Sequence, residues 1–349
     1  MNERSESGEL VRDIPNADYV RIGVLGDYML DEYVLGRVTR ISPESPVPVV
    51  EHQSQYSTLG GAGNVVMNIK ALGGTPVPFG IVGNDIGGRR IKCSLQDGAG
   101  VASESILVDS SRPTTVKTRI IAHNQQLLRI DAESRAPMTS ELREKMLAGV
   151  RSELPKLSAL IVSDYDKGVV SRPIFDTLLA ACLRARVPIV LDPKAFDLSD
   201  VGPVTVITPN EREAERFSGF PVDNDSAAER AGQALLEKTG ARNILITRGE
   251  HGMSLIPADG KIVHMPTQSK EVYDVTGAGD TVVAVLALAL AAGRTVLDAA
   301  CLANTAAGIV VGKMGTATVD REELESALAG RWPAQISRRR ALRARAGLS

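Results

Sequence analysis

The sequence predicts an α/β domain with a mostly parallel central sheet and a small second β-sheet inserted into it. Three observations predict this class. Short β-branched runs alternate with amphipathic helical stretches through most of the chain, as in parallel strands joined by crossover helices. The strand-like runs are apolar throughout, which is typical of strands covered on both faces. Two further pairs of strand-like runs have no helix between them, and these predict the inserted sheet.

Five apolar runs are predicted to be strands of the central sheet, and helices with recognisable ends separate them. The five runs are residues 20–25, 159–163, 187–191, 204–208 and 243–247. Ser171 with Pro173 marks the start of one helix, because proline is favoured in a first turn. Ser226 with Glu229 matches the capping-box pattern for the start of another helix, and Gly240 predicts its end.

The inserted sheet is predicted from two helix-free segments. Residues 33–53 contain one pair of strands around a proline-rich loop. Residues 114–131 contain a second pair around His123 and Asn124, which is typical of a hairpin. Four strands inserted in this way cannot bury both faces of their sheet alone. We therefore expect them to act as a lid over a site, as a dimer surface, or as both.

Composition limits the classes of function. At 349 residues and 43% hydrophobic, the chain can bury a large core. Its 40 basic and 42 acidic residues leave a net charge of -2, so we expect neither nucleic acid nor a membrane as a partner. The 3 cysteines fit neither a disulfide framework nor a zinc site, which favours the cytoplasm. The longest apolar run, residues 282–292, is too short for a membrane span and predicts a buried helix starting near Val282.

Segments of different composition flank the expected domain of residues 19–330. Residues 1–18 lack the apolar core of a secretory signal and are expected to form a flexible leader. Residues 331–349 form a basic tail, in which a nucleic-acid or membrane patch is one interpretation of the arginines. Because Trp332 is the tail's single aromatic residue, we favour a solvated tail or a dimer contact.

Polar residues follow all five predicted central strands. Ligands of open parallel sheets bind beyond the carboxyl ends of the strands. These residues are Asp27, Asp164, Asp192, Asn210 and the pair Arg248-Gly249. Because they would share one edge of the sheet, they predict a single polar cleft.

The strongest signal for chemistry is the segment 274–280, which directly precedes the predicted buried helix. The backbone amides of Gly277, Ala278 and Gly279 would converge at the positive end of that helix and form an anion site. Such donors stabilise the charge that spreads over the oxygens of a transferring phosphoryl group. Asp280 is placed to accept the proton of the attacking hydroxyl. The alternative is that Asp280 only caps the helix and the glycines only form a tight turn.

Two other glycine-rich segments do not match phosphate-binding motifs. Residues 308–313 contain a Gly-Lys pair, but Met314 stands where a P-loop needs Ser or Thr. Residues 60–64 have the spacing of a dinucleotide motif only in part, because Val66 stands where its last glycine would be. Since residues 60–64 precede an amphipathic helix, either their amides and Asn64 bind sugar hydroxyls or the small residues allow close packing.

Through residues 60–64 and 274–280, the sequence resembles the ribokinase family, also called the PfkB family of carbohydrate kinases, over about residues 20–329. Within the family it is most similar to bacterial kinases of D-glycero-β-D-manno-heptose 7-phosphate. That narrower likeness rests on residues 26–31, 40–50, 124–127 and 265–274. The resemblance implies a three-layer α/β/α ribokinase-like fold with a β lid that often pairs between subunits. It also implies ATP-dependent phosphorylation of the sugar phosphate at O1, in ADP-heptose and lipopolysaccharide biosynthesis.

The resemblance also implies roles for individual residues. Asp280 matches the family's base, and Gly277, Ala278 and Gly279 match its anion hole. The residues implied at ATP are Asn210, Glu211, Arg212, Glu213, Arg248, Gly249 and Asn304, and Glu213 would hold Mg²⁺ through water. Those implied at the sugar phosphate are Asp27, Gly60, Gly61, Asn64, Arg119, Asp164 and Lys167. A monovalent cation such as K⁺ is common in the family, and the sequence does not locate one.

The substrate's own phosphate requires a cationic site, for which Arg40, Arg119 and Lys167 are candidates. Two alternative functions remain open. One alternative to the heptose-phosphate kinase is another sugar or sugar-phosphate kinase of the same family. The other is a non-catalytic sensor that binds nucleotide and sugar on this fold. The presence of Asp280 together with a complete glycine turn favours a kinase over the sensor. The resemblance implies a homodimer through the lid.

Overall fold

The central sheet of the computed structural model combines seven parallel strands with two antiparallel ones at one edge. The structure describes residues 20–268, 272–313 and 315–330. In spatial order, the strands are β13 (Val263–Met265), β12 (Met253–Pro257), β11 (Asn243–Thr247), β10 (Val206–Ile207), β9 (Ile189–Asp192), β8 (Ala159–Ser163), β1 (Arg21–Gly26), β4 (Thr75–Gly83) and β5 (Ile106–Asp109). β12 pairs antiparallel with both β11 and β13, and the other neighbouring strands of this sheet pair parallel. The predicted leader 1–18 and basic tail 331–349 lie outside the described residues.

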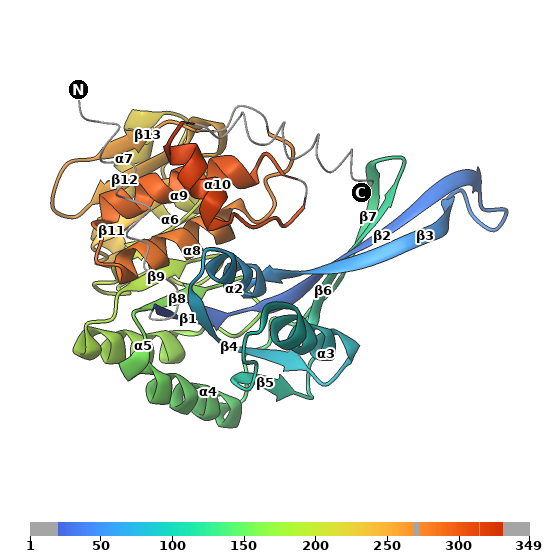
Figure 1. Ribbon diagram of the computed structural model, residues 1–349, viewed down its shortest axis with the longest axis horizontal. Helices are drawn as coiled ribbons and strands as arrows, with labels where there is room; N and C mark the ends of the chain where they lie inside the picture. Colours follow the sequence, from blue (N-terminus) through green and yellow to red (C-terminus); the bar gives the residue numbers. More distant parts are fainter. Residues whose placement is uncertain (1–19, 269–271, 314, 331–349) are drawn as a thin grey trace.

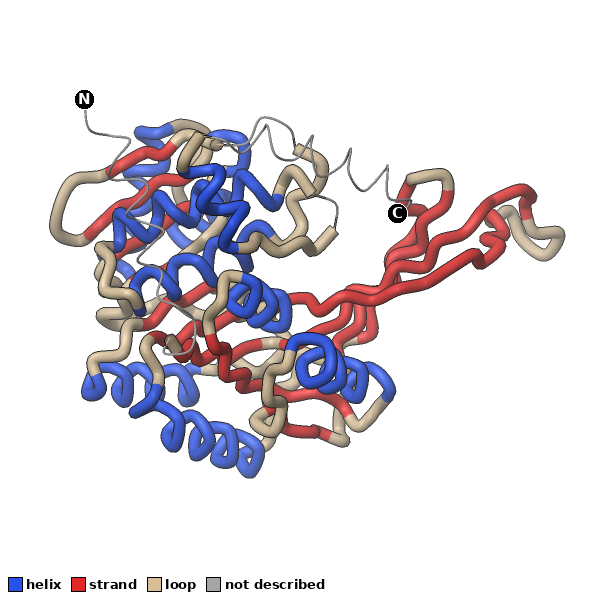
Figure 2. Tube along the Cα trace, in the orientation of Figure 1, coloured by secondary structure: helices blue, strands red, loops and turns tan. Residues whose placement is uncertain are grey.

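Helices cover both faces of this sheet (Figures 1 and 2). On one face lie α2 (Ala62–Ala71), α8 (Ala278–Ala291), α9 (Val296–Val310) and α10 (Arg321–Leu328). On the other face lie α4 (Ser140–Glu153), α5 (Arg172–Ala185), α6 (Glu211–Ser218) and α7 (Asp225–Thr239). A further helix, α3 (Ile86–Cys93), packs against β2 and β4. None of the described helices is long and apolar enough to cross a lipid bilayer.

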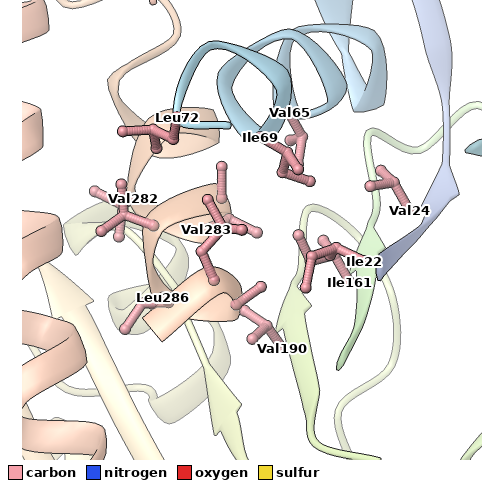
Figure 3. Close-up of a cluster of buried hydrophobic side chains, with 14 of the residues drawn as sticks. Ile22, Val24, Val65, Ile69, Leu72, Ile161, Val190, Val282, Val283 and Leu286 are labelled. Atoms are coloured by element: carbon pink, nitrogen blue, oxygen red, sulfur yellow. The ribbon is translucent and has the colours of Figure 1, made fainter. Parts of the chain in front are cut away.

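The strands supply alternate residues to two separate cores. Ile22 and Val24 of β1 face α2 and α8, whereas Leu25 faces the opposite side. Figure 3 shows the first of these cores, in which the strand residues meet Val65, Ile69, Val283 and Leu286. Each fully buried aliphatic side chain of this kind contributes about 1.5–3 kcal/mol to folding. The predicted α/β class with a mostly parallel sheet is confirmed, and double-sided burial explains why its strands are apolar throughout.

Two predicted helix starts are wrong. The helix expected to begin near Val282 begins at Ala278, because Gly277 adopts the left-handed conformation, with φ 80°, directly before it. Helix α7 is capped by Asn224, whose side chain accepts the amide of Ala227, so the predicted capping box of Ser226 with Glu229 is not present. The Glu229 carboxylate instead contacts a ring nitrogen of His264.

The second sheet, which we call the lid, has two strands close to their predicted bounds and two that are much longer than predicted. It contains β3 (Pro48–Gly61), β2 (Tyr28–Ile41), β6 (Thr115–Ala122) and β7 (Gln125–Ala132), in that spatial order. The lid projects from the body of the molecule (Figure 1). His123 and Asn124 both have positive φ and form the hairpin turn expected between β6 and β7. The predicted segment 114–131 therefore matches β6 and β7, whereas segment 33–53 covers only the outer part of β2 and β3, whose ends nearest the body were not predicted.

The crevice at the carboxyl ends of β1 and β8 is the topological switch point of the central sheet. From β1, the chain passes through the lid to β4 and β5 on one side, and β8 to β11 follow on the other. Gly26 ends β1 where a side chain would not fit, because a Cβ there would lie 2.2 Å from the Ser163 carbonyl oxygen of β8. The Asp27 amide donates to the same oxygen at 3.2 Å. Ligands of open α/β sheets bind at such switch points.

Candidate active site

Asp280 is a buried carboxylate in the first turn of α8, only 4% exposed. It accepts hydrogen bonds from Asn64 Nδ2 of α2 at 2.8 Å and from the Tyr165 hydroxyl, which follows β8, at 2.6 Å. Burial raises the pKa of Asp280 to about 6, although these two donors oppose the rise. The carboxylate therefore titrates near neutral pH, which suits a general base. Because the N-cap is Gly277 and both partners come from other elements, Asp280 is not a simple helix cap.

The turn before Asp280 leaves backbone amides free at the positive end of α8. Within the described part of the chain, the amides of Gly279 and Asp280 have no acceptor, whereas that of Ala278 donates to the Val275 carbonyl at 3.3 Å. Gly277 has no room for a side chain, since a Cβ there would lie 2.5 Å from Asn64 Nδ2. Gly279 is exposed and nothing lies within 4 Å of its Cβ position, so a ligand can approach it. The amides of Gly279 and Asp280 thus lie free at the positive end of α8, which is the arrangement that the sequence predicted for an anion site.

Asn64 belongs to a buried amide network that holds the carboxylate in place. Its Nδ2 donates to Asp280, and its backbone carbonyl accepts a hydrogen bond from Asn68 Nδ2 at 3.0 Å. The Thr281 hydroxyl donates to Asn68 Oδ1 at 3.0 Å. The structure therefore places the predicted sugar ligand Asn64 on the base itself.

Two of the predicted strand-end carboxylates bind backbone amides. Asp27 accepts the amides of Tyr165, Lys167 and Val169 at 2.7–3.3 Å, and burial raises its pKa to about 6. Asp164 accepts the amides of Asp166, Lys194, Ala195 and Phe196. Their oxygens hold the loops after β8 and β9. The geometry thus favours an organising role for both residues over the direct sugar contact that we expected.

Asp31 and Tyr165 are site residues that the sequence reasoning missed. Asp31, on β2, is buried and pairs with Arg119 Nη1 at 2.5 Å. Gly60 gives it room, since a Cβ at that position would lie 2.3 Å from Asp31 Oδ2. A charged residue in the otherwise apolar run 28–31 is the signal that could have identified Asp31. Tyr165 carries no such signal, because only the folded chain brings its hydroxyl to Asp280.

A groove runs from Gly279 along the carboxyl ends of β9, β10 and β11. Its polar lining includes Asp192, Lys194, Asn210 and Glu213. Asn210 and Glu213 form the capping box of α6, and Lys194 Nζ lies 2.6 Å from Glu213 Oε1. Burial, with the nearby carboxylates of Glu213 and Asp280, raises the pKa of Asp192 well above its ordinary value. The groove thus combines free amides for an anion with clustered carboxyl groups, whose ionised forms a bound cation would stabilise.

This donor set fits a magnesium ion that keeps most of its water. The described residues contain no cluster of three metal-binding side chains. Both oxygens of Glu213 are already engaged, one by Lys194 and the other by the Asn210 amide. Magnesium commonly binds through one or two carboxylates together with phosphate oxygens and water. Because a carboxylate oxygen can accept more than one hydrogen bond, Glu213 can still reach such an ion through water, and Asp192 is the second carboxylate.

The other residues predicted at ATP are not all brought into this groove. Arg248 is 2% exposed, and its guanidinium is enclosed by hydrogen bonds to Asp225 and Ser254. Asn304 is buried and donates to the Pro266 carbonyl at 2.8 Å. Glu211, Arg212 and Gly249 do not line the groove. Only Asn210 and Glu213 of the predicted nucleotide set lie beside Gly279.

The fold and site together have the features of a phosphotransferase that uses a nucleotide and acts on a sugar. Residues 22–323 match the model of the pfkB family carbohydrate kinases, and the chain belongs to this family. The predicted family and enzyme class are thereby confirmed.

Curated relatives and solved structures agree with this assignment. The chain is 46% identical over 308 residues to the bifunctional protein HldE of Desulfatibacillum aliphaticivorans, covering 88% of the chain and 63% of the relative. It is 43% identical over 324 residues to HldE of Paramagnetospirillum magneticum, covering 93% of the chain and 66% of the relative. The chain thus spans less than two-thirds of the length of these relatives. Arabidopsis thaliana ribokinase, solved with ribose and ATP, has a TM-score of 0.70 at 22% identity, covering 89% of this chain and 99% of its own. Thermotoga maritima ribokinase has a TM-score of 0.67 at 22% identity, and the match covers 89% of this chain and 99% of the ribokinase.

Replacing Tyr165 with Phe is expected to move the acid limb of the kcat/KM profile to higher pH by about one unit, the scale of one hydrogen bond to a charged group. The Tyr165 hydroxyl lowers the pKa of Asp280, so its loss raises that pKa and leaves less ionised base at pH 7. Activity near pH 9 should remain close to that of the wild type. The exposed lid residue Tyr56, replaced with Phe, serves as the control. An equal loss at every pH would contradict this role for Tyr165.

Proposed function

We propose that this chain transfers the γ-phosphoryl group of ATP to O1 of D-glycero-β-D-manno-heptose 7-phosphate, giving the 1,7-bisphosphate on the route to ADP-heptose and lipopolysaccharide. The observation that carries the reaction type is the buried Asp280 carboxylate, with its pKa raised to about 6, beside the free Gly279 amide. The likeness of residues 26–31 and 40–50 to heptose 7-phosphate kinases supports this substrate.

The geometry supports an in-line transfer assisted by one base. The O1 hydroxyl would give its proton to Asp280 as the oxygen attacks the γ-phosphorus, and the bond from that phosphorus to the β,γ-bridging oxygen breaks to release ADP. The amides of Gly279 and Asp280 would receive the charge that develops on the transferring oxygens. Tyr165 and Asn64 hold the carboxylate in one orientation, so little reorganisation is needed during the reaction.

Glu213 and Asp192 are the residues that would hold magnesium, Glu213 through water. Bound magnesium supplies neutralisation of the β- and γ-phosphate charge. Lys194, paired with Glu213, would hold that carboxylate in one position in the groove. A monovalent cation remains a prediction from the family likeness. The cytoplasm, where ATP is available and cysteines stay reduced, is the proposed location.

A homodimer through the lid is supported by a stripe of apolar side chains on one of its faces. Leu128 and Ile130 of β7 are 55% and 52% exposed, and Leu128 pairs across the sheet with Ile120. In the neighbouring strand, Val34 pairs with Ile120. A second copy of this chain would cover the stripe that these side chains form.

Replacing Asp280 with Asn is expected to lower phosphoryl transfer by about a hundredfold or more, while ATP and sugar phosphate still bind. Phosphorus NMR of the wild-type product, made from ATP, magnesium and heptose 7-phosphate, should show a new phosphate at C1. Asp259→Asn, on an exposed turn, is the control. Undiminished turnover by D280N would refute the role of the base, and a wild type active only on another sugar would refute the assigned substrate.

Glu213→Gln is expected to raise the magnesium concentration needed for half-maximal activity by roughly tenfold, the scale of losing a residue that orients a metal site. Glu323→Gln is a matched control, because Glu323 also forms a capping box, with Asp320, and an ion pair, with Lys313. Both variants should lose similar stability in thermal melts. If the magnesium requirement rises equally in both, Glu213 has no specific part in holding the metal.

Leu128→Glu is expected to convert the dimer into a monomer in sedimentation velocity, because it places a charge in the centre of the apolar stripe. Leu183→Glu, which changes an exposed leucine on α5, should leave the assembly intact. A wild type that sediments as a monomer at micromolar concentration would exclude the lid dimer.

A further inference from the structure

The face of the lid that looks toward Asp280 carries charged residues from three strands. Strand pairing places Asp31 beside Lys117 and Tyr33 beside Arg119. On the other side of β6, Lys117 pairs with Asp131 and Arg119 with Arg129. Because side chains alternate along a strand, these residues share one face, opposite to the apolar stripe.

Among these charges, Lys117 is the one without an ion-pair partner. Arg119 binds Asp31 at 2.5 Å, and Arg129 binds both oxygens of Asp131 at 2.8 Å. The two acids next to Lys117 are thus already neutralised by arginines. Across the described residues, no carboxylate lies within ion-pairing distance of the Lys117 ammonium, which is partly buried. Three cations and two acids leave one positive charge on this face, and it resides at Lys117.

This charge lies next to the reaction centre but outside the nucleotide groove. Lys117 Nζ is 5.8 Å from the centroid of the Tyr165 ring, whose hydroxyl binds Asp280. Lys117 does not line the groove that runs from Gly279 to Glu213, although Tyr165 does. A substrate that places a hydroxyl at Asp280 and extends away from ATP would therefore pass the Tyr165 ring and reach Lys117.

The cationic candidates from the sequence are less suited to bind an anion. Arg119 is occupied by Asp31, and Lys167 pairs with Glu133 at 2.9 Å. Arg40 lies near the outer end of β2, on an exposed part of the lid. A phosphate monoester carries a charge of about -1.5 to -2 near pH 7 and is readily bound by a lysine ammonium. Binding at Lys117 would need no existing ion pair to break.

We propose that Lys117 binds the phosphate group of the sugar substrate and thereby selects a phosphorylated sugar over its unphosphorylated form. This inference rests on the proposed function and deepens it. It assigns the preference for a sugar phosphate to one residue of the lid, so closure of the lid over the sugar would also complete the phosphate site.

The test is calorimetric binding of heptose 7-phosphate and of heptose without the phosphate, each with a non-hydrolysable ATP analogue and magnesium. Lys117→Met should weaken binding of the sugar phosphate about tenfold or more, the scale of a hydrogen bond to a charged group, and leave heptose binding unchanged. Lys117→Arg should restore part of the affinity. Lys145→Met, on the exposed face of α4, is the control.

Three results would overturn the inference. The first is an unchanged affinity of K117M for the sugar phosphate, and the second is an equal loss for both sugars, which would mean that Lys117 only supports Tyr165. The third comes from steady-state kinetics of K117M. A lower kcat at an unchanged KM for the sugar phosphate would place Lys117 on the transferred phosphoryl group.

The proposed function fails in a distinguishable way. If the wild type phosphorylates a different sugar phosphate, only the heptose assignment is lost, and the same comparison is made with that sugar phosphate and its parent sugar. If the wild type binds sugar phosphates no more tightly than the corresponding unphosphorylated sugars, the Lys117 inference is wrong, whichever sugar the enzyme phosphorylates.

Discussion

The site depends on one carboxylate that is buried and still able to ionise near neutral pH. Burial of Asp280 disfavours its charged form, while the Tyr165 hydroxyl, Asn64 Nδ2 and the amino end of α8 favour it. The incomplete cancellation leaves a pKa of about 6. A carboxylate with the ordinary pKa of about 4 would be a weaker base, and one without these donors would stay protonated. The value required for catalysis thus follows from two opposing effects at one residue.

The hydrophobic core sets the distances in that network. Asn64 is on α2, Asp280 is on α8 and Tyr165 follows β8, and these elements pack together through the core shown in Figure 3. Gly277 lets the two helices approach closely at the turn. Protein interiors are packed as densely as organic crystals, so their elements cannot shift freely. The same apolar contacts that stabilise the fold therefore also hold the donors at 2.6–2.8 Å from the carboxylate.

The parts that could be predicted from sequence have a local signal, and the parts that could not depend on tertiary pairing. Strands β1, β8 and β11 were predicted because uninterrupted apolar runs mark them. β4 was missed because Pro76 and Pro78 argue against a central strand. Both prolines lie in the part of β4 that pairs only with β1, because β5 begins opposite Gly80. On the side of β4 that faces away from β1, no strand is present at these positions to need their missing amides. In the same way, segment 274–280 identified Asp280, whereas Asp31, Lys117 and Tyr165 have no common spacing and meet only in the fold.

Strand alternation gives the two faces of the lid separate tasks, and register keeps those tasks apart. Lys117 and Arg119 face the site, whereas Ile120 belongs to the apolar stripe on the opposite face. A slip of one residue would exchange the faces and place charges in the stripe. The irregularities in pairing occur only beyond Val34 in β2 and beyond Ile120 in β6, toward the outer end of the lid. Bulges there can increase the twist of the lid without changing the register beside Asp280. An insertion nearer the body would disturb sugar recognition and subunit pairing together, because both depend on the same strands.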